Sequence, residues 1–206
     1  MRKIITIGRE FGSGGRELGR QLAQLLQIAY YDQEIITEIA RRTSMSEEYV
    51  QKITEKRPAV SIPIHTGNSF YLGPDPLLQQ SISVYAEQHK LLRELAEGSD
   101  CVIVGRCADY VLREEKPFRI FVYADSASKQ KRCLERRPEG ENLSEAQMKK
   151  KMEEIDRGRA KYYSFFSDQK WGARENYDLM VNTSGADLQK LADALCSYLQ
   201  KLGSIG

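Results

Sequence analysis

The sequence is poor in the residues that build metal centres and covalent cross-links. Its 206 residues include two histidines and four cysteines, and no two cysteines have the C-x-x-C spacing of zinc or redox motifs. The cysteines are Cys101, Cys107, Cys133 and Cys196. We therefore predict free thiols in a reducing compartment, the cytoplasm, and no metal-ligating set of side chains.

Long apolar runs and a strong net charge are lacking too. No stretch approaches the roughly 20 apolar residues that a membrane-spanning helix needs, and the apolar start of the chain turns polar before a signal-peptide core could form. The 31 basic and 29 acidic residues leave a net charge of only +2. These features argue against a dedicated membrane or nucleic-acid binder, so we expect neither as a partner. The oligomeric state stays open.

What is present is an ordinary globular balance, with 41% hydrophobic and 29% charged residues. A chain of this length fills one core, so we predict a single domain over residues 1–206. Apolar runs typical of strands alternate with segments of helical periodicity. The predicted strands are 3–7, 28–31, 101–104, 118–123 and 177–181. The predicted helices include 16–27, 33–42, 77–97, 106–113, 126–136, 144–166 and 187–202.

This alternation predicts an α/β fold, in which a parallel sheet of about five strands is covered by helices on both faces. Two segments stand out from the pattern. Residues 56–76 form an irregular insertion punctuated by proline and glycine. Residues 137–160 are a candidate lid, because Pro138 and Gly140 interrupt the preceding helix and the part that follows is largely polar, with little to anchor it to a core.

The first strand leads into the first helix through a glycine-rich turn, Gly12-Ser13-Gly14-Gly15. In such an arrangement the backbone N–H groups of the turn converge, and the helix dipole adds partial positive charge at the same place. Glycines also let phosphate oxygens approach the backbone closely. The alternative is a helix-entry loop that only closes the packing. The order of strand, turn and helix favours phosphate binding.

The turn departs from the common G-x-x-x-x-G-K-[ST] motif at three positions. When the second glycine of the motif is aligned on Gly14, Arg9 stands at the first glycine, Gly15 at the lysine and Arg16 at the serine or threonine. The hydroxyl that usually holds magnesium is thereby lost. Arg9 and Arg16 supply positive charge instead, since arginine binds phosphate oxygens bidentately.

Charged residues also follow other predicted strands. Asp32 comes directly after the second strand, Gly105-Arg106 after the third and Asp125 after the fourth. Because the carboxyl ends of parallel strands meet at one edge of a sheet, where ligands of such folds bind, we expect these residues near the glycine-rich turn.

Five strings of the sequence form a recognisable set. They are Ile5-Thr6-Ile7-Gly8-Arg9-Glu10-Phe11-Gly12-Ser13-Gly14-Gly15-Arg16-Glu17, Tyr30-Tyr31-Asp32, Val104-Gly105-Arg106, Trp171-Gly172 and Tyr177-Asp178-Leu179. This set resembles the bacterial cytidylate kinase-like family, divergent relatives of the CMP kinases, over nearly the whole chain. The resemblance implies a three-layer P-loop NTPase fold with a helical lid, and ATP as phosphoryl donor. It also implies Mg²⁺, although the usual ligand of that ion in the turn is missing.

CMP kinases themselves are matched in part. Their Gly-Arg-Asp is similar to Gly105-Arg106 with Cys107 in place of the aspartate, and part of their lid motif is similar to Asp156 and Arg159. The arginine with which they grip the acceptor phosphate has no counterpart, because Glu38 stands at its position. Nearby Arg41 or Arg42 would have to replace it.

The resemblance implies an ATP-dependent phosphotransferase of the nucleoside monophosphate kinase type, with the acceptor left open. The alternatives are a nucleotide-binding regulatory protein without kinase activity and a kinase for a non-nucleotide small molecule. The residues expected to bind ATP are Arg9, Gly12, Ser13, Gly14, Gly15 and Arg16. Those expected to bind the acceptor are Asp32, Arg41, Arg106, Arg132 and Asp156. The catalytic candidates are Arg16, Asp32, Arg106 and Arg159.

Overall fold

The computed structural model describes residues 2–54, 76–137 and 143–203. In this part of the chain five parallel strands form one sheet, in the order β2–β3–β1–β4–β5. The strands are β1 (Ile4–Arg9), β2 (Ala29–Tyr31), β3 (Cys101–Val104), β4 (Phe118–Tyr123) and β5 (Leu179–Asn182). The parallel sheet predicted from the sequence is confirmed.

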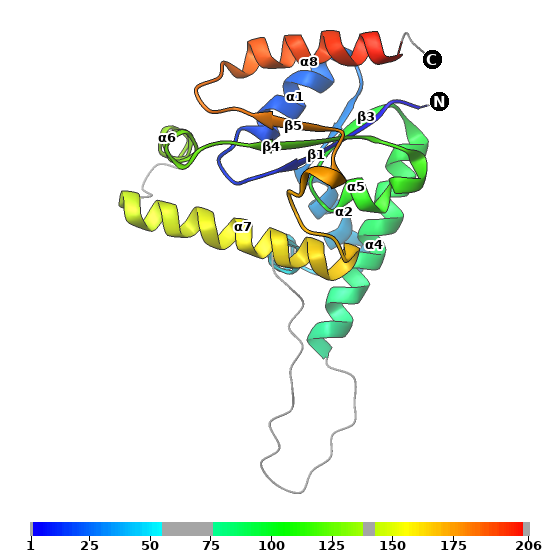
Figure 1. Cartoon of the computed structure of the whole chain (residues 1–206). Coiled ribbons are helices and arrows are strands. Elements are labelled where there is room, and N and C mark those ends of the chain that lie inside the picture. The colour runs from blue at the N-terminus through cyan, green and yellow to red at the C-terminus, as the bar shows by residue number, and fades with distance from the viewer. Residues whose placement is uncertain (1, 55–75, 138–142, 204–206) are drawn as a thin grey trace, which may run out of the picture.

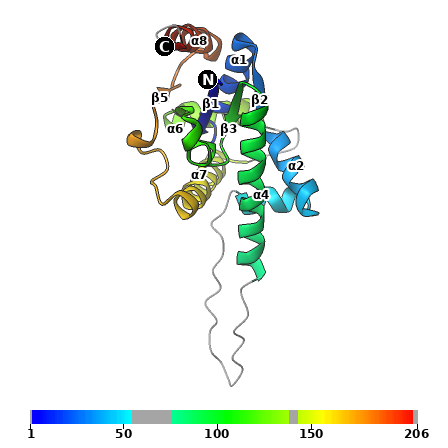
Figure 2. The same ribbon diagram turned by 90° about the vertical axis from the view of Figure 1, so that its right-hand side faces the viewer.

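Helices cover both faces of this sheet, which gives three layers (Figure 1, Figure 2). One face carries α1 (Gly15–Leu26) and α8 (Leu188–Gly203). The other carries α2 (Gln33–Thr43), α3 (Glu47–Thr54), α4 (Pro76–Gly98), α5 (Ala108–Val111) and α7 (Glu145–Ser167). After β4 comes α6 (Ser126–Glu135), and two short 3-10 helices are η1 (Arg113–Glu115) and η2 (Arg174–Asn176). No helix within the described ranges is long and apolar enough to cross a membrane.

The central strands β1 and β3 are mostly apolar because both of their faces are buried. On β1, Ile4 packs into the core under α2 and α4, whereas Ile5 and Ile7 pack into the core under α1 and α8. On β3 all four side chains are buried. Burial of each large aliphatic side chain contributes about 1.5–3 kcal/mol, so the two cores hold the sheet between its helices.

The parallel order brings the carboxyl ends of the strands to one edge. The glycine-rich turn leaves β1 there, and Asp32 is the first residue after β2. Gly105 and Arg106 follow β3 at the same edge, and Asp125 follows β4 within two residues. The sequence-based placement of these residues at one edge is therefore confirmed.

Three predicted element boundaries are wrong by two residues or more. The first strand, predicted over 3–7, continues to Arg9. The helix expected over 106–113 is the single turn α5, because Gly105, Arg106 and Cys107 have φ angles of +76°, +59° and +52°, and a right-handed helix cannot include such residues. The last strand begins at Leu179 rather than at Tyr177, because Tyr177 is the C-cap of η2 and pairing with β4 begins at Leu179.

The two unusual segments are only partly described. The insertion predicted over 56–76 lies outside the described residues except for Pro76, which begins α4. Of the candidate lid, residues 138–142 lie outside them too, and most of the rest belongs to α7. The premise that the lid has little to anchor it is wrong, because Met148 and Met152 are buried. Closure of the lid on ligands stays a prediction.

Candidate functional site

The glycine-rich turn presents the start of α1 to solvent without a side-chain cap. Its last residue before the helix, Gly14, is the N-cap and adopts a left-handed conformation with φ of +81°. Glycine cannot cap with a side chain, so the first N–H groups of α1 stay available at the positive end of the helix dipole. This is the geometry that binds anions, phosphate in particular.

Close packing against α6 requires glycine at position 12. A Cβ atom on Gly12 would lie 2.8 Å from the sulfur of Cys133 and 2.9 Å from the carbonyl oxygen of Lys129. The φ angle of Gly12, +75°, also disfavours other residues. The turn therefore follows a path that only this glycine permits.

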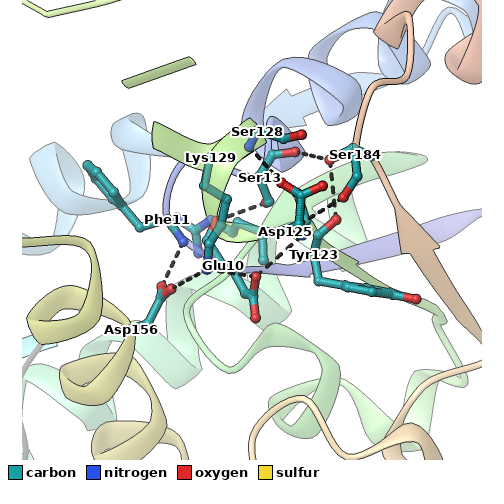
Figure 3. A network of polar contacts seen from close by, with 12 residues as sticks. Glu10, Phe11, Ser13, Tyr123, Asp125, Ser128, Lys129, Asp156 and Ser184 are labelled. Carbon is teal, nitrogen blue, oxygen red and sulfur yellow. Dashed lines mark hydrogen bonds and ion pairs between the residues drawn. The ribbon is translucent and has the colours of Figure 1, made fainter. Parts of the chain in front are cut away.

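A polar network connects the turn to α6 and α7 (Figure 3). The backbone N–H of Phe11 donates to Asp156 Oδ1 over 2.7 Å, and Lys129 Nζ lies 3.0 Å from Glu10 Oε2 and 3.6 Å from Asp156 Oδ2. Inside the turn, the Ser13 hydroxyl donates to the carbonyl of Glu10 over 2.8 Å. Burial raises the pKa of Asp156, and the hydrogen bond from Phe11 acts against that rise. The turn is thus held in place by residues from distant parts of the chain.

A cavity of about 580 Å³ opens beside the turn, and we call it the large cavity. Its wall includes Gly12, Gly14 and Gly15 together with seven cationic side chains. These are Arg9, Arg16, Arg132, Arg136, Arg137, Lys151 and Arg159. Two acidic residues, Glu10 and Glu17, also line it. The excess of positive charge and the exposed start of α1 suit a polyanionic ligand.

Two arginines on either side of the turn, Arg9 on β1 and Arg16 on α1, meet at Asp32. This carboxylate is only 4% exposed; Arg9 Nη2 lies 3.7 Å from its Oδ1, and Arg16 Nη2 donates to the same oxygen over 3.5 Å. Arg9 extends along the edge of the sheet to the end of β3, where a Cβ atom on Gly105 would lie 1.7 Å from its Nη1. Glycine at 105 therefore makes room for the Arg9 guanidinium.

The described residues fit a resident magnesium ion poorly. Arg16 replaces the usual hydroxyl ligand, and Asp32, the carboxylate nearest to it, is already bound by two arginines. No group of three carboxylate, cysteine or histidine side chains within the described ranges could hold a metal.

A second cavity, of about 40 Å³, lies at the ends of β1 and β3, and we call it the small cavity. Arg106, 8% exposed, lines it; its Nη1 donates to Thr54 Oγ1 over 2.8 Å, and its carbonyl accepts from Gln88 Nε2 over 2.9 Å. Arg9 and Arg159 line both cavities. The two cavities are therefore neighbours that share two guanidinium-bearing side chains.

The inner wall of the small cavity carries one carboxyl group among tyrosines. The Tyr163 hydroxyl donates to Asp109 Oδ2 over 2.7 Å. Burial raises the pKa of Asp109, and the hydrogen bond from Tyr163 opposes the rise. Tyr162 and Tyr177 complete this wall together with Trp171.

The structure brings most of the predicted site residues together. Those lining the large cavity are Arg9, Gly12, Gly14, Gly15, Arg16, Arg132 and Arg159. Ser13 is buried in the turn, and Asp156 holds the Phe11 amide. Arg41 does not join them: its side chain is 71% exposed, pairs with Glu38 and lines neither cavity.

Sequence reasoning missed part of the site. It gave no functional role to Lys129, Asp109, Tyr162 or Tyr163. The two tyrosines are buried, and they also line the small cavity. Tyr177 lies in one of the recognised strings, which was the available signal for it.

Most of the chain is similar to one known protein family. A model of the cytidylate kinase-like family matches residues 4–185. An uncharacterized protein from Eubacterium ventriosum ATCC 27560 is similar in structure, with a TM-score of 0.66 and 25% identity, over 97% of this chain and 99% of that one. The comparison with curated proteins finds no match.

Two shikimate kinases share the fold. The enzyme from Bacteroides thetaiotaomicron has a TM-score of 0.58 and 14% identity over 98% of both chains. The enzyme from Acinetobacter baumannii, solved in complex with shikimate, has a TM-score of 0.52 and 18% identity over 98% of this chain and 94% of that one. At these identities the likeness extends to the fold alone.

Proposed function

The chain belongs to the cytidylate kinase-like family and has the fold of P-loop kinases, and on this premise we propose that it is an ATP-dependent phosphotransferase. The observation that carries the proposal is the large cavity, where the uncapped start of α1 faces a wall of seven cationic side chains. A nucleotide polyphosphate is the ligand that matches such a surface.

In the proposed complex the amides from Gly12 to Arg16 hold the phosphates of ATP. Arg16 and Arg132 add charge from α1 and α6, and Asp32 positions Arg16. Arg159 lies between the two cavities, beside the transferring phosphoryl group. Catalysis of this kind consists mainly of positioning and charge stabilisation, for which arginine is suited.

The acceptor would approach from the small cavity. An oxygen of the acceptor forms a bond to the γ-phosphorus, the bond from that phosphorus to the β–γ bridging oxygen breaks, and ADP leaves. Arg9 and Arg159 reach both cavities, so they would contact donor and acceptor groups alike. Such shared contacts hold the reacting groups close together.

One alternative has an observation in its favour. Gly15 and Arg16 replace the lysine and the hydroxyl residue of the common motif, which suits a nucleotide-binding protein that no longer transfers phosphate. A second alternative is a kinase for a non-nucleotide acceptor, since the fold also occurs in a shikimate kinase solved with shikimate.

An acceptor screen tests the proposal. Purified protein with ATP and magnesium is offered nucleoside monophosphates and small hydroxy acids in turn, and ADP release is measured. We expect release that depends on one class of acceptor and falls in Arg16→Ala but not in Arg20→Ala, since Arg20 lies a turn further along α1 and does not line the large cavity. ATP binding without release for any acceptor favours the regulatory alternative. Failure to bind ATP contradicts the proposal.

A further inference from the structure

We propose that the small cavity recognises one oxyanion group of the phosphoryl acceptor, a carboxylate or a phosphate, with the hydroxyls of Tyr177 and Tyr162 as hydrogen-bond donors to it. This inference rests on the proposed function, because it takes the neighbouring large cavity as the nucleotide site. It adds a ligand class and two recognition residues to that function.

The first observation is a pair of buried hydroxyl groups. Tyr177 and Tyr162 are only 7% and 3% exposed, and neither hydroxyl has a hydrogen-bond partner among the described residues. Tyr163 and the backbone of Gly172 lie near the hydroxyl of Tyr177, and Gln88 lies near that of Tyr162. None of these contacts meets hydrogen-bond geometry. A buried donor without a partner costs free energy, which a ligand oxygen in the cavity would recover.

The hydroxyl of Tyr177 lies at the reacting edge of the sheet. A Cβ atom on Gly8, near the end of β1, would stand 3.3 Å from this oxygen. Gly8 and Arg9 line the same cavity. A ligand group bound there is therefore beside the strand that leads into the phosphate-binding turn.

The second observation is the charge of the wall. Three arginine side chains, Arg9, Arg106 and Arg159, line the small cavity, and Asp109 is the one carboxyl group in its lining. Outside the lining, Asp32 pairs with Arg9 and Asp156 with Arg159. Asp109 already accepts the Tyr163 hydroxyl, and its burial favours the neutral form. Guanidinium groups bind carboxylates and phosphates in preference to neutral groups, so the cavity selects an oxyanion.

The third observation is size. A cavity of about 40 Å³ holds about three water-sized groups. That space admits the oxygens of a carboxylate or a phosphate and is too small for a nucleobase. The group bound in this part of the site is therefore the anionic end of the acceptor, whatever the remainder of the molecule is.

Trp171 provides the readout, because it lines the small cavity and is the only tryptophan in the chain. The protein is first saturated with ADP, which fills the large cavity, and is then titrated with inorganic phosphate, with acetate and with CMP while Trp171 fluorescence is followed. We expect saturable changes with phosphate or acetate, and the stronger of the two identifies the anion. With CMP, the fluorescence change reaches saturation only if the phosphate of CMP is the recognised group.

Two pairs of variants test the donors. Tyr177→Phe should bind the preferred anion roughly tenfold more weakly, the loss expected for one hydrogen bond to a charged group. The free variant should be at least as stable as the wild type, since the substitution removes a buried hydroxyl without a partner. Tyr198→Phe, at a tyrosine that is 46% exposed and lines neither cavity, is the matched control. Arg106→Gln should weaken binding of the same anion more than Tyr177→Phe does, and Arg113→Gln is its control.

The outcomes separate the two proposals. If ADP does not bind, the proposed function fails before the anion titration begins. If ADP binds but neither anion saturates, the function stands and the small-cavity site is wrong. Unchanged anion affinity in Tyr177→Phe, or a loss of affinity together with a loss of stability, overturns the role of that hydroxyl. Because Tyr177→Phe changes a single atom, the test does not depend on whether Arg106→Gln folds.

Discussion

The backbone N–H of Phe11 donates to the carboxylate of Asp156 across 2.7 Å, although the two residues are far apart in the sequence. This hydrogen bond joins the glycine-rich turn to α7, the helix expected to act as a lid. Lys129 on α6 lies within 3.6 Å of the same carboxylate. The shape of the turn therefore depends on two helices that lie more than 100 residues further along the sequence.

Removing the carboxylate of Asp156 should loosen both the turn and α7. We expect Asp156→Ala to lower the free energy of unfolding by about 1.5–3 kcal/mol, the range for a hydrogen bond to a charged group. Asp156→Asn keeps an acceptor for the Phe11 N–H and should lose less stability.

The lid is tested by hydrogen exchange over residues 143–160. Exchange there should speed up in the alanine variant, and in the wild type it should slow when ATP and acceptor are both bound. Exchange that is slow and identical with and without ligands contradicts the lid.

Arg16 and Arg20 form a matched pair for testing the phosphate site. Both side chains are exposed on α1, but Arg16 lines the large cavity and contacts Asp32, whereas Arg20 does not line it. We expect Arg16→Ala to weaken ATP binding by roughly 1.5–3 kcal/mol, because a charge-assisted contact is lost, and Arg20→Ala to leave it nearly unchanged. Calorimetric titration measures both. If both substitutions weaken ATP binding by the same small amount, Arg16 does not contact the phosphates.

Stability should depend on pH through Asp109. Because burial raises its pKa in the folded protein, the folded state holds the proton more tightly than the unfolded state does. The free energy of unfolding therefore falls as pH rises from the unfolded-state pKa, about 3.9, through the raised folded-state pKa. We expect Asp109→Asn to remove this fall, so its stability relative to the wild type should increase with pH. Urea unfolding across that range checks the sign, and parallel curves for the two proteins would contradict it.

Binding of ATP should survive removal of magnesium. The turn has no hydroxyl at the magnesium position, and its positive charge comes from arginine. We expect EDTA to weaken ATP binding by less than about tenfold, or about 1.4 kcal/mol. Calorimetry with and without chelator measures the difference. A much larger loss would mean that groups of this site hold the ion.

The sequence was sufficient for the sheet and for the turn, because both rest on local patterns. Apolar runs such as 101–104 are buried on both faces, and glycines near residue 12 stand where the backbone needs a left-handed conformation. Arg41 was expected at the acceptor site instead, but in the structure it pairs with Glu38, three residues before it on α2, and lines neither cavity.

The small cavity was not predictable in the same way. Arg106 is held in a left-handed conformation between Thr54 and Gln88, which are far from it in the sequence. Asp109 and Tyr177 are far apart in the sequence, and the folded chain brings both to the wall of the small cavity. Such contacts have no periodicity or spacing, so composition and pattern carry no signal for them.

The most direct measurement is a titration of ¹⁵N-labelled protein with ATP, followed amide by amide. The account predicts that the resonances of residues 12–16 shift most, that they saturate together with one dissociation constant, and that Arg16→Ala raises this constant. Resonances around Tyr198 on α8 serve as the internal reference, because its ring packs on Phe118 at the start of β4, the opposite edge of the sheet from the turn. If ATP saturates the protein while the amides of residues 12–16 stay unmoved, the turn is not the phosphate site and the account is contradicted.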